Sequence, residues 1–321
     1  MPSRRQIDSP DILTGQTMFE SFRNEYKASL KSYDTEEHID LAFYRPIGFA
    51  WALLFRRLHI SPNAVTIASI FIGVAAGICL FPSGMAVNIV GMALLMTANS
   101  LDSADGQLAR LTKQYSRLGR ILDGMAGDFW FISIYVSICL RTNATVPFFS
   151  GIPSLIWILA VTAGICHGRQ AAMADYFRQF HLLFVKKDFP SELDSSATIL
   201  RQYRSLTWRR LPRKLILGVY YLYTRSQEKA TPAMQRLLIR LHREYPSGKL
   251  PESLSEEIRR ATLPCCKWEN FLTFNWRYIT LLLTVLAGNP FWYFIVELTL
   301  FNAVLLYLRI RHERICSALS L

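Results

Sequence analysis

The stretch Asp102-Ser-Ala-Asp105-Gly106-Gln-Leu-Ala109-Arg110 lies at the end of a long apolar segment. Its two carboxylates are three residues apart, and side chains at that spacing share one face of a helix. An ionisable side chain inside a membrane-spanning segment costs about 3 kcal/mol, so it indicates a functional site by default. The stretch therefore predicts an acidic site that is built into a membrane helix.

Two further aspartates, Asp123 and Asp128, lie near the start of the next apolar segment. A short basic turn separates the two segments, so antiparallel helices are predicted to bring Asp102, Asp105 and Asp123 together. Carboxylates in one place repel one another, and a bound divalent cation removes that repulsion. Oxygen ligands suit Mg²⁺ or Mn²⁺, and Mg²⁺ is usually shared with substrate phosphates. The alternative is a group of aspartates that only caps helix ends or pairs with nearby arginines.

The apolar segments predict the fold class. Apolar residues make up 51% of the 321 residues and charged residues 19%, against about 25% charged residues in typical soluble proteins. A spanning helix needs roughly 20 largely apolar residues. We therefore predict an all-α integral membrane protein with six transmembrane helices, at residues 62–81, 87–109, 121–140, 152–176, 271–287 and 290–308.

The basic residues predict the orientation. The formal charge is +12, and with a cytoplasmic N-terminus all but three of the 36 Lys and Arg residues fall in cytoplasmic segments, the exceptions being Arg141, Arg169 and Arg277. This bias follows the positive-inside rule. We expect a multi-pass protein with both termini and the site in the cytoplasm (in the inner membrane if the source is bacterial). Because the basic residues flank the spans and no nucleic-acid motif is present, no nucleic-acid partner is expected.

The rest of the sequence is organised around these helices. An apolar segment with three arginines predicts an N-terminal interfacial helix before the first span. A long basic insertion with an amphipathic pattern is expected to be a helical cytosolic segment that lies on anionic lipid, with a cap that contacts the substrate as the alternative. The predicted order is a polar N-terminal segment, the interfacial helix, the membrane core with four spans, the insertion, and two spans with the C-terminal tail, at residues 1–39, 40–58, 59–180, 181–268 and 269–321.

The aspartate motif resembles the signature of the CDP-alcohol phosphotransferases, or CDP-alcohol phosphatidyltransferases. That signature reads DxxDGxxAR, eight residues, then GxxxDxxxD. Seven of its eight fixed positions match here, including Gly119 and Asp123. The turn Ser61-Pro62-Asn63-Ala-Val-Thr66 is also similar to the PNxxT motif that is common in the family. By motif, the resemblance covers roughly residues 40–180.

The resemblance implies an enzyme of phospholipid biosynthesis with six transmembrane helices, usually a homodimer in membrane lipid. An acceptor hydroxyl attacks the phosphorus next to the alcohol of a CDP-alcohol, and CMP leaves. The resemblance implies that Asp102, Asp105 and Asp123 bind Mg²⁺ or Mn²⁺. It also implies that the cytidine nucleotide is bordered by residues of both motifs, namely Gly106, Ala109, Arg110, Asn63 and Thr66.

The last aspartate of the signature is replaced. Gly127 holds its position, and Asp128 follows one residue later. At roughly 100° per residue, position 127 lies about 40° from Asp123 around a regular helix, whereas Asp128 lies about 140° away. A one-residue π-bulge, which Gly124 and Gly127 would make easy, would bring Asp128 back to the site. We favour this bulge, with Asp128 as a metal ligand and catalytic base; otherwise the base comes from elsewhere or none is needed.

Basic residues at the inner end of the fourth span suggest which acceptor the enzyme uses. Arg169 and His167 lie where the family has its acceptor pocket, and a cation there suits a phosphorylated acceptor. We therefore favour inositol or inositol phosphate, as in phosphatidylinositol(-phosphate) synthases. The favoured donor is CDP-diacylglycerol, because the predicted site opens beside the acyl chains of the inner leaflet.

Several alternatives stay open. The acceptor is otherwise glycerol phosphate or serine, or a CDP-linked head group is donated to a lipid hydroxyl. Membrane prenyltransferases also use aspartate motifs with Mg²⁺, but they have two separate motifs, and the DG and AR pairs argue against that class. The non-enzyme alternatives are a transporter and an inactive family member, and Gly127 favours the latter.

Overall fold

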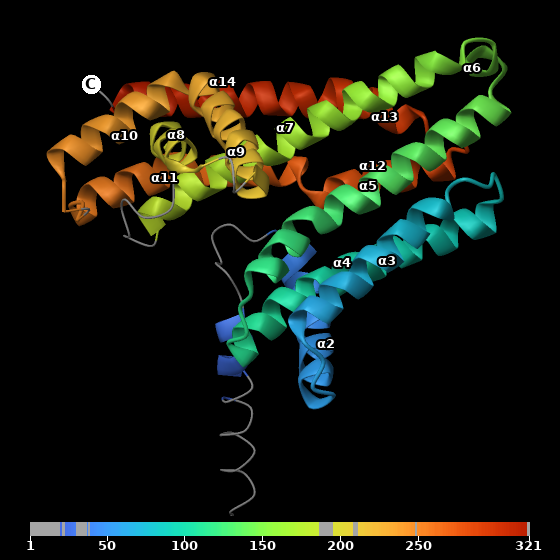
Figure 1. Cartoon of the computed structure of the whole chain (residues 1–321), viewed down its shortest axis with the longest axis horizontal. Coiled ribbons are helices and arrows are strands. Elements are labelled where there is room, and N and C mark those ends of the chain that lie inside the picture. Colours follow the sequence, from blue (N-terminus) through green and yellow to red (C-terminus); the bar gives the residue numbers. More distant parts are fainter. Residues whose placement is uncertain are drawn as a thin grey trace, which may run out of the picture. The chain divides into compact units, whose positions relative to one another are not determined.

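The computed structural model describes residue 20 and residues 23–29, 37, 39–185, 195–207, 211–247 and 249–319. Throughout these residues the chain is helical and forms no strand, as predicted (Figure 1). The chain divides into two compact units, Met1–Thr145 and Val146–Leu321. The division falls inside the predicted membrane core, so the aspartate motif and the fourth predicted span lie in different units.

The first unit is made of three long helices and a shorter one. A π-helical turn η1 (Asp40–Tyr44) leads into α2 (Arg45–Arg57), which packs against α4 (Met85–Thr112). Between them in sequence, α3 (Pro62–Ile78) packs against both α4 and α5 (Arg117–Thr145). The helix predicted at 40–58 is therefore present, and its position at the membrane surface stays a prediction.

Local sequence sets the helix ends near the aspartates. Ser61 caps α3, since its side chain accepts a hydrogen bond from the Ala64 N–H at 3.4 Å, and Pro62 occupies the first turn. Helix α4 ends at Thr112, and Lys113 adopts a left-handed conformation with φ of 54°. This conformation ends the helix and turns the chain toward α5.

Glycines allow α3 and α5 to approach closely. A side chain at Gly73 would overlap the indole of Trp130, and one at Gly77 would overlap Ser133. The Trp130 Nε1–H also donates to the Ser69 carbonyl at 3.0 Å. Small residues and interhelical hydrogen bonds are typical of helix packing in membranes. This contact holds α5 against α3 beside the aspartate motif.

The second unit is built around α7 (Pro153–Val185), which packs against α11 (Glu252–Glu269) and α14 (Asn302–Leu319). Its core includes Phe177 and Phe180 of α7. The other elements are α6 (Pro147–Gly151), α8 (Ser196–Ser205), α9 (Leu211–Ala230), α10 (Pro232–Glu244), η3 (Asn270–Leu272), α12 (Phe274–Leu286), α13 (Trp292–Val296) and the π-helical turn η4 (Glu297–Phe301).

Helix α10 of the insertion buries its apolar face against protein, and the contact of the insertion with anionic lipid stays a prediction. Its Leu237 and Leu241 are buried in the core of the second unit. The Glu313 carboxylate of α14 accepts hydrogen bonds from the backbone N–H groups of Ala233 at 2.8 Å and Met234 at 3.2 Å. These N–H groups have no partner within the first turn of a helix, so Glu313 anchors the start of α10 to α14.

The six predicted spans each correspond to a helix or a run of helices. Among the described residues, three helical segments are long and apolar enough to cross a membrane by length and composition: Met85–Thr112, Leu122–Thr145 and Trp292–Leu319. Helix α3 is apolar but shorter. The chain therefore has the helices of a membrane protein, and its six-span topology stays a prediction.

Candidate active site

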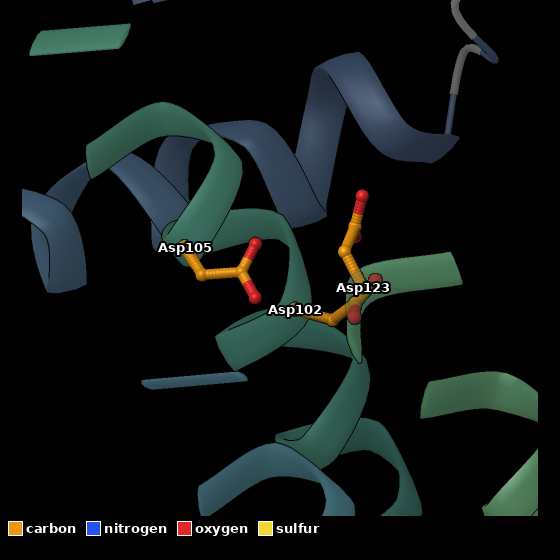
Figure 2. Close-up of side chains that lie close together, drawn as sticks. All are labelled: Asp102, Asp105 and Asp123. Carbon is orange, nitrogen blue, oxygen red and sulfur yellow. The ribbon is translucent and has the colours of Figure 1, made fainter. Parts of the chain in front are cut away.

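Three aspartates from two helices meet in the first unit. Figure 2 shows Asp102 and Asp105 on α4 and Asp123 on α5. One carboxylate oxygen from each residue lies within 4.8 Å of the other two. The predicted convergence of these three side chains is confirmed, and it follows from the spacing on α4 and the return of the chain through α5.

Thr66 of α3 holds one of these carboxylates. Its hydroxyl donates a hydrogen bond to Asp105 Oδ2, and both side chains are buried. Thr66, Ser69 and Gly73 are at positions i, i+3 and i+7 of α3, and all three are buried. The PNxxT motif therefore places its threonine on the packed face of α3, where it fixes the orientation of Asp105.

The surroundings of the cluster carry some positive charge. Arg45 of α2 attracts the charge of Asp102, and Arg110 of α4 attracts that of Asp105. Arg45 also donates to the Ser103 hydroxyl at 3.3 Å, which holds α2 beside the motif. Three carboxylates thus meet beside two guanidinium groups, one of which follows Asp105 within the motif itself.

The donor set fits a hard divalent cation. All the clustered ligands are oxygens, and no described His or Cys joins the group. The Asp102 Oδ1 atom is buried and has no hydrogen-bond partner among the described residues, although such burial costs free energy. A cation between the carboxylates would satisfy this oxygen and reduce the repulsion. Mg²⁺ or Mn²⁺ suits such ligands, whereas softer metals prefer nitrogen or sulfur.

A pocket of about 190 Å³ opens beside the aspartates. Asp105 and Asp123 line it, so two of the three clustered aspartates border this space. All five residues predicted to border the cytidine nucleotide line the same pocket, namely Asn63, Thr66, Gly106, Ala109 and Arg110. The structure therefore brings the two sequence motifs together around one cavity.

Two glycines of the motif lie in different surroundings, one in a contact between helices and one beside open space. A Cβ at Gly119 would overlap Asn63 Oδ1 and approach Ser116 Oγ to 2.9 Å, so contact between α3 and α5 requires glycine there. A Cβ at Gly106 would meet only the Arg110 guanidinium, at 3.5 Å. Because the protein itself does not fill the space beside Gly106, that space is open to a ligand in the pocket.

The connection between α4 and α5 supplies residues that the sequence analysis missed. Gln114, Tyr115 and Ser116 line the pocket. The Ser116 hydroxyl donates to Asn63 Oδ1 at 3.0 Å and accepts from the Gly119 N–H at 2.8 Å. Ser116 thus caps the start of α5 and ties it to α3. A serine just before a helix is a cap signal, so Ser116 could have been found.

Arg110 is also held from outside the motif. Its Nε donates to the backbone carbonyl of Ser29 at 2.5 Å. Ser29 belongs to the helical residues 23–29, where Tyr26 packs edge-on against Phe49 of α2 with ring centroids 5.2 Å apart. The N-terminal residues therefore orient the guanidinium that lines the pocket. No sequence signal could have found this contact, because the acceptor is a backbone carbonyl.

Asp128 is not a member of the aspartate cluster. Helix α5 is α-helical from Arg117 to Thr145, without a π-turn, so the expected bulge is absent. A Cβ at Gly124 or Gly127 would meet no atom within 4 Å, so no close contact forces the helix to distort there. The predicted role of Asp128 as ligand and base stays a prediction, and the regular helix argues against it.

The two predicted acceptor residues lie on different sides of α7 in the second unit. Arg169 lines a pocket with residues of α9 and α14, whereas His167 is half-buried near the charge of Arg277 on α12. Residues two apart in a helix point in nearly opposite directions, at roughly 200°. The structure therefore does not bring these side chains into one pocket, and their contact with an acceptor stays a prediction.

Comparison with protein families gives the class of the domain. A family model described as CDP-alcohol phosphatidyltransferase matches residues 59–180. The match includes α3, α4 and α5, and with them the three clustered aspartates and every residue of the adjoining pocket. Residues 59–180 therefore match a CDP-alcohol phosphatidyltransferase domain, as the aspartate motif indicated, and this match supports phosphotransfer from a CDP-alcohol as the general reaction class. A comparison with curated proteins finds no match.

Proposed function

We propose that this protein is a metal-dependent phosphatidyltransferase that moves the phosphatidyl group of CDP-diacylglycerol to a polar alcohol and releases CMP. The observation that carries the proposal is the cluster of three carboxylates that adjoins a pocket lined by both family motifs. The family match supports the reaction class. The identities of the donor, the acceptor and the metal are proposed in addition to that reaction class.

The residues of the pocket suggest how the donor is bound. A divalent cation held by Asp102, Asp105 and Asp123 would neutralise the charge that builds as the bond to CMP breaks. Arg110 offers guanidinium donors to a phosphate oxygen on the same side as Asp105. Gly106 leaves room for the nucleotide to approach the backbone of α4. The chain thus positions the pyrophosphate between carboxylates and an arginine.

Proton transfer from the acceptor is the least defined step. The acceptor hydroxyl attacks the phosphorus of the phosphatidyl group, the bond to the CMP oxygen breaks, and the hydroxyl proton must leave. Asp128 is the base predicted from the sequence, but α5 would have to distort to bring it to the cluster. A base outside the motif, or a reaction without one, is the alternative that the regular helix favours.

Inositol or inositol phosphate remains our proposed acceptor, with Arg169 and His167 as its predicted contacts. Glycerol phosphate, serine and a CDP-linked head group with a lipid hydroxyl are the alternatives. The distribution of basic residues supports a six-span, multi-pass topology with the site and both termini in the cytoplasm. A homodimer is proposed from the family resemblance.

The test measures CMP release by the purified protein in lipid nanodiscs with CDP-diacylglycerol. The acceptors are inositol, inositol phosphate, glycerol phosphate and serine, added one at a time, and a separate reaction pairs CDP-inositol with diacylglycerol. We expect CMP only with an inositol acceptor. CMP with glycerol phosphate or serine alone would replace our acceptor. No CMP in any reaction would support an inactive family member, which the substitution at Gly127 favours.

A further inference from the structure

A second pocket, of about 340 Å³, lies within the second unit and has no assigned role. Its lining comes from α7, α9 and α14, so the basic insertion supplies one of its walls through α9. Two arginines, Arg169 and Arg309, line the pocket, and no acidic side chain is among its described lining residues. The pocket is therefore positively charged where the pocket of the first unit is acidic.

Both guanidinium groups have N–H donors that form no hydrogen bond with the described residues. Arg169 forms no hydrogen bond or ion pair with any residue that the structure describes. Arg309 is held by one bond only, from its Nε to the Ala230 carbonyl at 2.7 Å, which leaves its Nη atoms without a partner among the described residues. Two arginines that line one cavity, with no acidic side chain among its described lining residues, attract an anion, and their planar donors suit phosphate in particular.

The walls around the arginines are apolar and lead to exposed apolar surface. Ile165 of α7 and Leu306 of α14 line the pocket and are 61% and 55% exposed. Helix α14 belongs to the candidate span Trp292–Leu319. On α9, exposures of 59% to 69% are found for Leu215, Ile216, Val219 and Leu222. Apolar side chains exposed at this density indicate contact with lipid.

The attachment of α9 keeps this pocket in shape. Gln227 Nε2 donates to the Ala172 carbonyl of α7 at 2.9 Å, and the Arg309 bond to Ala230 ties the end of α9 to α14. The C-terminal part of α9 is thus fixed to both helices, while its preceding turns expose their apolar side chains. A ligand that spans both regions needs an anionic group and a long apolar part.

We propose that this pocket binds the phosphate of an anionic phospholipid, with Arg169 and Arg309 contacting the phosphate and the acyl chains lying along the exposed apolar residues of α9 and α14. The apolar wall and the candidate span distinguish this ligand from a soluble phosphate ester. Arg169 is also the proposed acceptor contact, so the two proposals compete for this residue, and the lipid proposal does not otherwise depend on the transferase activity.

The test is native mass spectrometry of the purified protein in detergent, with palmitoyl-oleoyl phosphatidylglycerol or palmitoyl-oleoyl phosphatidylcholine added at equal concentration. The two lipids share their acyl chains and differ in net charge. We expect at least about tenfold more bound phosphatidylglycerol, and we expect the Arg169→Gln/Arg309→Gln double variant to lose this preference. The Arg225→Gln/Arg236→Gln double variant removes the same charge from exposed positions outside the pocket, and it should bind as the wild type does.

Three outcomes would overturn the proposal. The first is an equal level of both lipids on the wild type, and the second is an equal loss of phosphatidylglycerol in both double variants. The third is displacement of phosphatidylglycerol from the wild type by inositol phosphate, at concentrations that displace no lipid from the Arg169→Gln/Arg309→Gln double variant. That result would make the pocket a site for soluble phosphate esters. Circular dichroism and thermal melting establish that each variant is folded before its lipid binding is compared.

Discussion

The two units arrange their acidic side chains in opposite ways. In the second unit, buried Glu297 pairs with Arg277 Nη1 at 2.6 Å, and buried Glu269 faces His312 Nε2 at 3.2 Å. In the first unit, Asp102, Asp105 and Asp123 converge on one another. An acid that faces a basic side chain has its charge offset within the fold, whereas acids that are gathered together repel one another and would bind a cation from outside. We therefore propose that the first arrangement is structural and the second functional.

The Arg277 pair shows what a closed arrangement looks like. Arg277 Nη2 donates to Gln170 Oε1 at 2.9 Å, and Gln170 Nε2 donates to the Glu297 carbonyl at 3.1 Å. The network joins α7, α12 and the π-helical turn η4, and its members are fully or almost fully buried. A satisfied network of this kind specifies the packing of its helices. None of its members lines either of the two pockets described above, so we assign it no part in the reaction.

The largest predicted effect falls on the gathered carboxylates. Asp105→Asn removes one charge from the cluster and weakens any bound cation, so CMP release should fall by about a thousandfold or more. Asp175→Asn is the matched control, because Asp175 is exposed on α7 and accepts only a local hydrogen bond from Gln179 at 2.7 Å. CMP release at near wild-type rates in Asp105→Asn would remove this aspartate from the mechanism.

The next largest effect is a loss of stability when the ion pair between Arg277 and Glu297 is broken. Arg277→Met leaves Glu297 buried without its partner, which should lower the free energy of unfolding by about 3–5 kcal/mol. The Arg277→Met/Glu297→Met double variant removes both charges and should recover most of that loss. Chemical denaturation in detergent measures both. If the double variant is no more stable than Arg277→Met, the instability does not come from the unpaired charge of Glu297.

A smaller effect is predicted at the contact that shapes the nucleotide pocket. Gly119→Ala places a methyl group against Asn63 Oδ1, and such overpacking costs about 1–3 kcal/mol. The KM for the CDP-alcohol should rise roughly tenfold or more as Asn63 is pushed into the pocket. Gly124→Ala on the same helix meets no atom within 4 Å and should change KM little. Equal KM values for the two variants would contradict this assignment of Asn63.

The smallest effect is predicted at Asp128. With α5 regular, Asp128 lies away from the cluster, so Asp128→Asn should keep at least about a third of the CMP release rate. Gly127→Asp restores the family aspartate on the face of Asp123 and should retain or raise the rate. If Asp128→Asn loses its activity while Gly127→Asp keeps it, Asp128 is the base. Helix α5 would then have to distort when the substrate binds.

Features encoded by local spacing were predictable from the sequence. The three-residue separation of Asp102 and Asp105, and the helix reversal before Asp123, were enough to predict the cluster. The PNxxT motif likewise placed Thr66 beside the aspartate motif, where it lines the same pocket as Asp105 and Asp123. These predictions depend on helix geometry and on a specific motif, and neither needs knowledge of distant contacts.

Features that depend on contacts between distant segments were not predictable. The carbonyl of Ser29 that holds Arg110 leaves no trace in the motif, and the pairing of Arg277 with Glu297 depends on how α12 and η4 pack. The burial of α10 could not be separated from lipid contact, because an amphipathic pattern fits either neighbour. The opposite directions of His167 and Arg169 did follow from their spacing and could have been foreseen.

The central claim is that the gathered carboxylates act through a bound divalent cation. The most direct measurement is CMP release from CDP-diacylglycerol with Mg²⁺ present, after its removal with EDTA, and after excess Mg²⁺ or Mn²⁺ is returned. We predict that release stops with EDTA and recovers with either cation, and that Ca²⁺ or Zn²⁺ restores much less. Release that continues undiminished in EDTA would contradict the metal site and, with it, the distinction between the two units.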